Sequence, residues 1–390
     1  MNSWRKYIPE GTRDILLEEC EDIVYMENLL REIYIKRGFV EIKSPTLEFY
    51  DVFVNESSIL PQEKMYKLFD NLGRILVLRP DMTTPIARIA STKLKEIPHP
   101  LKLFYNANVY RLNEDLNGRH NEIMQSGVEI IGANGLKADV EVIVTGIEAL
   151  KGIGLEDFKI EIGEANFVQN VINEIEVDKN IKKELCKYIG NKNFTAIEEF
   201  IEDNKNTLKK DIIYKLRELP KLFGSIEILK LAKSLTTNNK ALKALNNLEE
   251  LYEVLKQLGY EKYLSLDLSM FQNLNYYTGT IFRAYVHTVG DSILSGGRYD
   301  NLTKNFGGDK AATGFAIDLY SAIKALKNKE IIYENKIEKV LIYYKDDFKK
   351  AYKYGEELRK KGAIVELSLI YDEKEAETYA KTKNMKVIKI

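Results

Sequence analysis

The amino-acid sequence predicts an α+β protein in which one mostly antiparallel sheet, flanked by helices, is interrupted by a helical segment. Short apolar runs bounded by turn residues lie on both sides of residues 166–262. That segment is instead rich in Lys, Glu, Asn and Leu, and its leucines recur with helical spacing. After residue 336 the chain alternates strand, helix and strand, which predicts a small α/β module.

The N-terminal part is expected to begin with a helix and to continue into strands. Acidic residues cluster from Glu18, and apolar residues recur at three- and four-residue steps from Ile23 to Ile33, which predicts an amphipathic helix. We expect this helix to end near Gly38. Strands are expected at 39–42, 75–78, 101–109 and 123–131. Asparagine, aspartate and glycine between the last two predict an antiparallel hairpin with a long loop.

The later elements complete the sheet and the module. We expect helices at 140–147, 315–327 and 349–361, and strands at 158–162, 263–268, 278–286, 292–294, 340–344, 364–370 and 386–390. A chain of 390 residues has room for two or three domains of about 150 residues each. We therefore predict a core at 1–327, interrupted by a helical insertion at 166–262, and a module at 336–390.

The composition excludes several classes of protein. The net charge of -1 gives no overall attraction to nucleic acid or to anionic lipid. Cys20 and Cys186 are too few and too far apart for a disulfide framework, and the three histidines lack the spacing of a metal site. No secretory signal, membrane-spanning segment or common nucleotide-binding loop is apparent. We therefore expect a cytoplasmic protein without a metal or another cofactor.

Polar side chains alternate along the strand expected at 123–131. Gln125, Gly127 and Glu129 are two residues apart and share one face, and the glycine leaves room for a ligand against the sheet. A carboxylate beside such a space favours a cationic or hydrogen-bond-donating group. The alternative is that Glu129 pairs with a neighbouring arginine and that Gly127 relieves a bulge.

Two further clusters carry polar groups suited to a ligand. Arg111, at a strand end, and Arg119, across the loop, are candidates to clamp an anion, although both fit a solvated loop equally well. Tyr276 and Tyr277 offer phenol groups to a pocket, although a tyrosine pair on a strand also fits ordinary packing.

Taken in order, these clusters resemble histidyl-tRNA synthetase and its relatives across roughly residues 7–327. The segments that carry the resemblance are 9–14, 38–45, 78–81, 110–129, 275–279 and 296–300. The resemblance implies a class II aminoacyl-tRNA-synthetase core, with 38–45 similar to the segment of that family at the dimer interface. It also implies that 336–390 is a truncated relative of the anticodon-binding domain.

The family resemblance assigns roles to individual residues. Arg111 falls where the family grips the α-phosphate of ATP, and Glu129 and Tyr277 fall where it reads the imidazole of histidine. Asp81, Thr83 and Gln125 fall where it holds the amino group of histidine. The predicted histidine-binding residues are thus Asp81, Thr83, Arg111, Gln125, Glu129, Tyr276 and Tyr277, with Arg119 as a candidate anion-binding residue.

Departures from the synthetase pattern argue against catalysis. Gln272 and Ser321 stand where the family has arginines that bind ATP and the reacting carboxylate. Loss of a single preorganised donor at such a site typically slows catalysis by ~10²- to 10³-fold. We therefore expect no catalytic residues and no aminoacylation of tRNA.

An amino-acid pocket without the ATP-binding arginines looks most like the regulatory subunits of ATP phosphoribosyltransferase. That resemblance implies a cytoplasmic hetero-oligomer in histidine biosynthesis, in which a self-dimer of this chain joins a short-form catalytic subunit and histidine acts as the feedback effector. No tRNA partner is expected. The alternatives are a functional histidyl-tRNA synthetase and a synthetase-like accessory protein that binds nucleic acid. Whether histidine binds in this pocket or at a subunit interface stays open at this stage.

Overall fold

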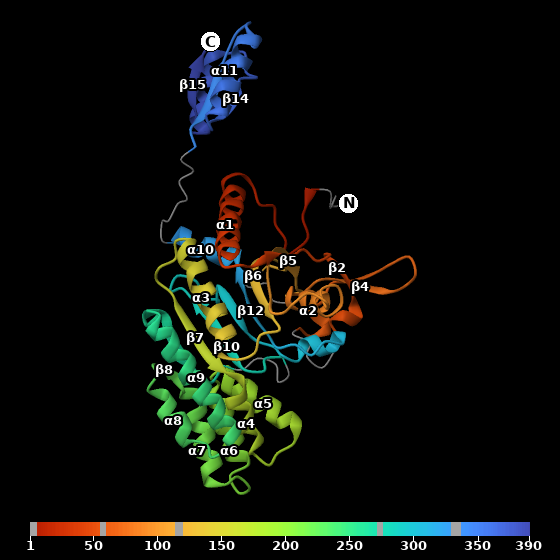
Figure 1. Cartoon of the computed structure of the whole chain (residues 1–390), viewed down its shortest axis with the longest axis vertical. Coiled ribbons are helices and arrows are strands. Elements are labelled where there is room, and N and C mark those ends of the chain that lie inside the picture. The colour runs from red at the N-terminus through yellow and green to blue at the C-terminus, as the bar shows by residue number, and fades with distance from the viewer. Residues whose placement is uncertain (1–5, 55–59, 114–119, 271–275, 329–336) are drawn as a thin grey trace. The chain divides into compact units, whose positions relative to one another are not determined.

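The computed structural model describes residues 6–54, 60–113, 120–270, 276–328 and 337–390. The chain forms two compact units, 1–331 and 332–390, which are described separately here (Figure 1). None of the described helices is long and apolar enough to cross a membrane.

A nine-stranded mixed sheet forms the centre of the first unit. Neighbouring strands pair antiparallel except β1 with β5 and β7 with β9. This sheet, flanked by helices, confirms the predicted α+β fold class. Its strand order is β1 (Val40–Glu41), β5 (Leu101–Tyr110), β6 (Glu122–Ile131), β12 (Ala312–Asp318), β11 (Leu294–Arg298), β10 (Thr280–Tyr285), β7 (Lys159–Glu164), β9 (Leu264–Asp267) and β8 (Phe223–Gly224).

Helices cover both faces of this sheet. On one face lie α1 (Leu17–Lys36), α3 (Leu136–Gly152) and α10 (Leu319–Asn328), and there Phe104 of β5 packs against Tyr34 of α1. Because strand residues alternate between faces, the neighbouring Tyr105 joins the opposite apolar cluster with α2 (Thr83–Thr92). The sheet is thus buried on both faces near β5 and β6.

Helices of the predicted insertion gather at the β8 end of the sheet (Figure 1). They are α4 (Ala165–Asn173), α5 (Lys179–Gly190), α6 (Phe194–Asp203), α7 (Lys210–Glu218), α8 (Ile228–Ser234) and α9 (Asn239–Gln257). Leu248, Leu251 and Leu255 of α9 are buried, and α9 packs against both α3 and α4. The insertion is therefore anchored to the sheet by its last and longest helix.

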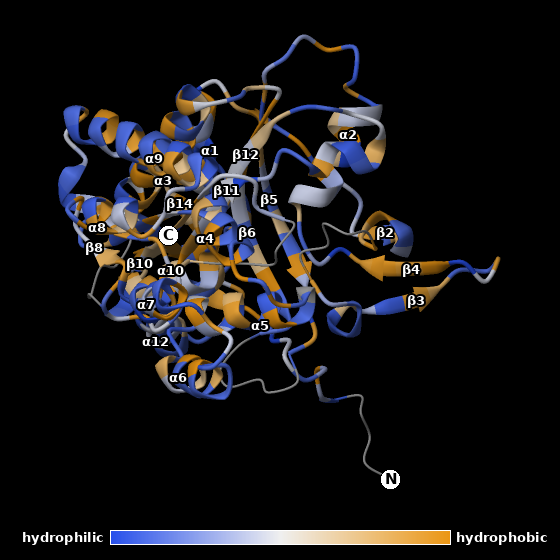
Figure 2. Ribbon diagram, turned by 90° about the horizontal axis from the view of Figure 1, so that it is seen from below, coloured by the Kyte–Doolittle hydropathy of each residue, from blue (hydrophilic) through white to orange (hydrophobic). Residues whose placement is uncertain are grey.

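A small antiparallel sheet of β2 (Leu47–Phe49), β4 (Ile75–Leu78) and β3 (Lys67–Phe69) projects from the first unit (Figure 2). Only β4 was predicted, because the other two strands have three residues each and show too little alternation to be recognised. Apolar side chains remain exposed on this sheet and its turn, namely Leu47, Phe49, Leu68, Phe69, Leu72 and Ile75.

The second unit is a three-stranded parallel sheet with two helices. Its elements are β13 (Lys339–Tyr343), α11 (Phe348–Lys360), β14 (Ile364–Leu367), α12 (Glu373–Thr382) and β15 (Lys386–Lys389), with β13 in the centre. Helix α12 was not predicted, because Ala376 and Ala380 alone form its buried face and give a weak apolar stripe. Short 3-10 helices elsewhere span Tyr50–Val52, Gln62–Lys64, Leu219–Lys221, Glu261–Tyr263 and Leu302–Phe306.

Several predicted element boundaries were wrong, and two of them lie beside the cavity described below. The helix expected at 315–327 begins at Leu319, because the Asp318 carboxylate accepts the backbone amides of Tyr320 and Ser321 and caps it there. The preceding residues continue β12. Strand β11 extends to Arg298, beyond the expected 292–294, since its glycines concealed the strand pattern. An added Cβ at Gly296 would lie 2.6 Å from the Phe282 ring, so the close packing there excludes a side chain.

Candidate functional site

A cavity of about 280 Å³ lies on the α2 face of the central sheet. The seven residues predicted from the sequence to bind histidine all line it, although they come from α2, β5, β6 and β10 or the segments next to them. These residues are Asp81, Thr83, Arg111, Gln125, Glu129, Tyr276 and Tyr277. Arg119, the candidate anion-binding residue, and Gln272 lie outside the described residues.

Glu129 is a buried carboxyl group held by two hydroxyl groups. Thr83 donates to one of its oxygens at 2.8 Å, and Tyr299 donates to the other. Among the described residues it forms no ion pair, so the alternative in which an arginine neutralises it is not what the structure shows. Burial raises the pKa of Glu129 to about 8, and the nearby Asp81 acts in the same direction.

Gly127, which lies between Gln125 and Glu129 on β6, serves a different purpose from the one predicted. An added Cβ at this position would lie 2.6 Å from the phenol oxygen of Tyr105. The glycine therefore makes room for Tyr105, and not for a ligand lying directly against the strand. Tyr105 itself lines the cavity and belongs to the apolar cluster on this face of the sheet.

The loop at the start of α2 holds the residues at the other side of the cavity. The Asp81 carboxylate accepts the backbone amide of Thr84 at 2.7 Å, and burial raises its pKa. The Nε of Arg111 donates to the carbonyl oxygen of Pro80 at 2.8 Å. Both charged groups are thus fixed by the same short segment, which defines the distance between them.

Tyrosine rings form another wall of the cavity. Tyr276 is buried and stacks on Tyr299 with ring centroids 5.9 Å apart, and it meets Tyr277 edge to face at 4.7 Å. Burial raises the pKa of Tyr277 to about 12, so its hydroxyl group remains protonated at neutral pH. The tyrosine pair therefore has both roles that the sequence suggested: the two rings pack against their neighbours, and they line the cavity.

Most residues that line the cavity were not predicted as site residues, and three of them show why. Tyr299 follows two glycines and an arginine that were recognised as a motif, but its contact with Glu129 depends on strand order. Asp318 was placed inside a helix, and Tyr105 was part of an apolar run. The described lining carries three carboxyl groups, those of Asp81, Glu129 and Asp318, and one cation, Arg111, so the cavity suits a small ligand with ammonium or other N–H donors.

The buried Glu129 carboxyl group predicts a specific dependence of stability on pH. Its pKa rises from 4.5 in the unfolded chain to about 8 in the folded one, so the folded state binds the extra proton between these values. The free energy of unfolding of wild type should therefore fall, relative to that of Glu129→Gln, as the pH rises through this range. Urea unfolding of both proteins at several pH values measures the difference. Parallel curves would contradict the assignment.

Comparison with known proteins agrees with the fold. The described fold resembles a crystal structure of histidyl-tRNA synthetase from a Nostoc species, with a TM-score of 0.81 and 21% identity over 98% of this chain and 90% of that one. It also resembles a structure described as an ATP phosphoribosyltransferase regulatory subunit/histidyl-tRNA synthetase from Bacillus halodurans C, with a TM-score of 0.90 and 31% identity over 100% and 99% of the two chains.

The fold and the amino-acid-sized cavity together define a class II synthetase-like protein, and the histidyl-tRNA synthetase family model matches residues 11–322. The chain is 53% identical to an ATP phosphoribosyltransferase regulatory subunit of Clostridium kluyveri over all of both chains. It is 41% identical to that of Bacillus mycoides over 95% of this chain and 88% of the relative. Within the synthetase-like proteins, the chain belongs to the family of ATP phosphoribosyltransferase regulatory subunits.

Proposed function

We propose that this chain is the histidine-sensing regulatory subunit of a cytoplasmic ATP phosphoribosyltransferase, and that it acts on a separate, short-form catalytic subunit. This proposal rests on the sequence similarity of the whole chain to proteins named as regulatory subunits, with 53% and 52% of residues identical. In it, the partner performs the first step of histidine biosynthesis, and this chain permits that activity and confers feedback inhibition by histidine.

The proposed effector site is the cavity around Glu129. An imidazole ring would lie between Glu129 and Tyr277, whose carboxyl and phenol groups can satisfy its two nitrogens. The ammonium group of histidine would face Asp81, Thr83 and Gln125. Arg111 would then meet the histidine carboxylate, because it is the cation among the described residues that line the cavity. This arrangement pairs each polar group of histidine with a complementary group.

Loss of the ATP-binding cations supports a role without catalysis. At Ser321, where the synthetases have an arginine, the backbone amide donates to Asp318 at 3.0 Å as part of the cap of α10. A serine there supplies no positive charge to an α-phosphate. We therefore propose that the chain neither forms histidyl-adenylate nor charges tRNA, and that it has kept the amino-acid pocket for sensing.

We also propose that two copies of this chain associate within the hetero-oligomer. Val40 of β1, in the segment similar to the dimer-interface region of the synthetases, is 65% exposed. Phe69 and Leu72 on the projecting small sheet are 74% and 77% exposed. Large apolar side chains that are this exposed favour burial against another protein surface.

Reconstitution tests the proposed function. Purified chain mixed with a short-form catalytic subunit should form a complex, seen by light scattering after size exclusion, that contains at least two copies of this chain. Turnover of ATP and phosphoribosyl pyrophosphate should rise well above that of the catalytic subunit alone. The chain alone should show no histidine-dependent pyrophosphate exchange. Absence of both complex and activation would refute the proposal, and robust exchange would favour a functional synthetase.

A further inference from the structure

A second cavity, of about 470 Å³, lies between the central sheet and the insertion, where α3, α4 and α9 converge. Two chain segments, at residues 277–278 and 298–300, contribute to both this cavity and the proposed histidine site, but with different residues. Tyr277 and Tyr299 line the first cavity, whereas Thr278, Arg298 and Asp300 line the second. The two cavities are therefore distinct, and a ligand in one leaves the other accessible.

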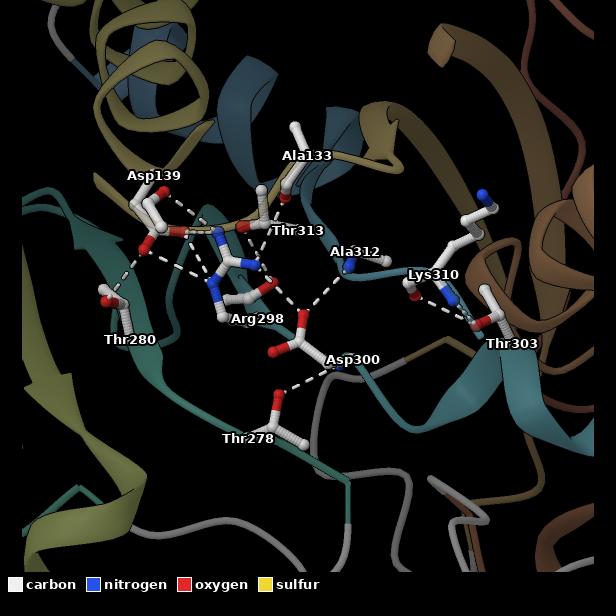
Figure 3. Close-up of polar contacts among 12 residues, drawn as sticks. Ala133, Asp139, Thr278, Thr280, Arg298, Asp300, Thr303, Lys310, Ala312 and Thr313 are labelled. Carbon is white, nitrogen blue, oxygen red and sulfur yellow. Dashed lines mark hydrogen bonds and ion pairs between the residues drawn. The ribbon is translucent and has the colours of Figure 1, made fainter. Parts of the chain in front are cut away.

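A network of buried and partly buried charges forms one wall of this second cavity (Figure 3). Arg298 donates to Asp139 at 2.7 Å and to Asp300 at 3.0 Å. Asp300 is held in turn by its own backbone amide, which donates to the Thr278 hydroxyl at 2.9 Å. The guanidinium group is held by the two carboxylates and by the carbonyl oxygens of Ala133 and Gly135, so this wall is preformed.

Glu164 adds a carboxyl group with which none of the described residues forms an ion pair. It ends β7, is only 4% exposed and lines the cavity. Its hydrogen bond is a local one, from the backbone amide of Asn166 at 3.2 Å, and it forms no ion pair within the part of the chain that the structure describes. Burial raises the pKa of Glu164 to about 7. A cationic donor beside it would relieve that cost of burial.

Two lysines line the same cavity from the insertion. Lys240 lies in the first turn of α9 and Lys243 at the start of the second, and neither forms an ion pair among the described residues. Cations are unfavourable at this end of a helix, where the dipole is positive, unless an anion accompanies them. Because no acidic residue occupies this first turn, the position favours an external anionic group.

We infer that this cavity binds a small aliphatic zwitterion, with its ammonium group at Glu164 and its anionic group at Lys240 and Lys243. Asn166 and Asn170 also line the cavity and supply further hydrogen-bonding groups. The described lining residues include no aromatic side chain, which favours an aliphatic ligand over a nucleobase or an imidazole. Such a ligand would bridge the central sheet and the insertion.

Titration calorimetry with β-alanine and phosphoethanolamine as probes tests this inference, with saturating histidine present to fill the other site. Both charges of a probe should be needed, so ethanolamine alone and inorganic phosphate alone should bind about tenfold or more weakly. Glu164→Gln, which keeps the oxygen that accepts from Asn166, and the double variant Lys240→Ala with Lys243→Ala should each weaken zwitterion binding about tenfold or more.

Lys256→Ala provides the matched control, because Lys256 lies at the far end of the same helix and pairs with Glu261 at 3.0 Å. It should bind the probes like wild type. The inference is overturned if neither probe binds at millimolar concentration, or if the Glu164 and lysine variants bind them unchanged. Histidine binding, measured on the same variants, should stay at the wild-type level, so failure here is distinguishable from failure of the proposed function.

Discussion

Arg298→Ala should lower the free energy of unfolding by about 3–5 kcal/mol, the usual effect of breaking a buried ion pair by removing one partner. Its side chain is 6% exposed, and that of Asp139 is 12% exposed. Removing the guanidinium group leaves the Asp139 carboxylate buried without its cation, and the carbonyl oxygens of Ala133 and Gly135 lose a donor. Urea denaturation followed by circular dichroism measures the change.

Arg217→Ala is the control for the loss of an arginine, because its pair with Glu198 is exposed, at 45% and 48%. Exposed pairs contribute only about 0–1 kcal/mol, so this variant should unfold almost like wild type. Replacing both buried partners, as Arg298→Met with Asp139→Leu, should recover stability relative to Arg298→Ala. Equal losses for the exposed and the buried arginine would show that the buried network contributes little to stability.

Glu129→Ala should weaken histidine binding by about tenfold to a hundredfold. An imidazole N–H or imidazolium donor beside Glu129 favours the ionised carboxylate. Hydrogen bonds to a charged group contribute ~1.5 to 3 kcal/mol, and ~1.4 kcal/mol corresponds to one decade of affinity. Calorimetric titration of the isolated chain with histidine measures the effect. Glu129→Gln serves as a second variant of nearly unchanged volume, because Ala also leaves the Thr83 and Tyr299 hydroxyl groups without their acceptor.

Glu122→Ala is the matched control on the same strand. Its carboxylate accepts from Asn108 at 2.8 Å and from Tyr110 at 3.1 Å, outside the cavity. This variant should bind histidine like wild type. Activation of the catalytic partner should survive in Glu129→Ala, since the changed residue is buried in a pocket and not on an assembly surface. Unchanged histidine binding in that variant would place the effector elsewhere, for example at a subunit interface.

Strong local periodicity made much of the fold predictable. The hairpin of β5 and β6 was recognised from two long apolar runs with turn residues between them, and the first helix from apolar residues that repeat at the helical period. The boundary of β12 and α10 was missed because apolar residues continue across it. The structure locates the boundary through the capping carboxylate of Asp318, whose role depends on backbone geometry.

The candidate site shows the same division between local and long-range information. Gln125 and Glu129 could be placed on one face from their even, four-residue spacing along a strand, and the family resemblance supplied the remaining residues. The contact between Glu129 and Tyr299 could not be predicted, because β6 and β11 are both neighbours of β12 although they lie far apart in the sequence. The second cavity was missed for a similar reason, since it joins β7, β11 and α9.

The histidine inhibition curve of the reconstituted complex tests the central claim most directly. Catalytic subunit assembled with wild-type chain should be inhibited by histidine, and assembly with Glu129→Ala should give equal activity without histidine. In the Glu129→Ala complex, the inhibitory concentration of histidine should rise about tenfold to a hundredfold. The dissociation constant of histidine from the isolated variant should rise by the same factor. Identical inhibition curves for the two complexes would show that the cavity around Glu129 is not where this protein senses histidine.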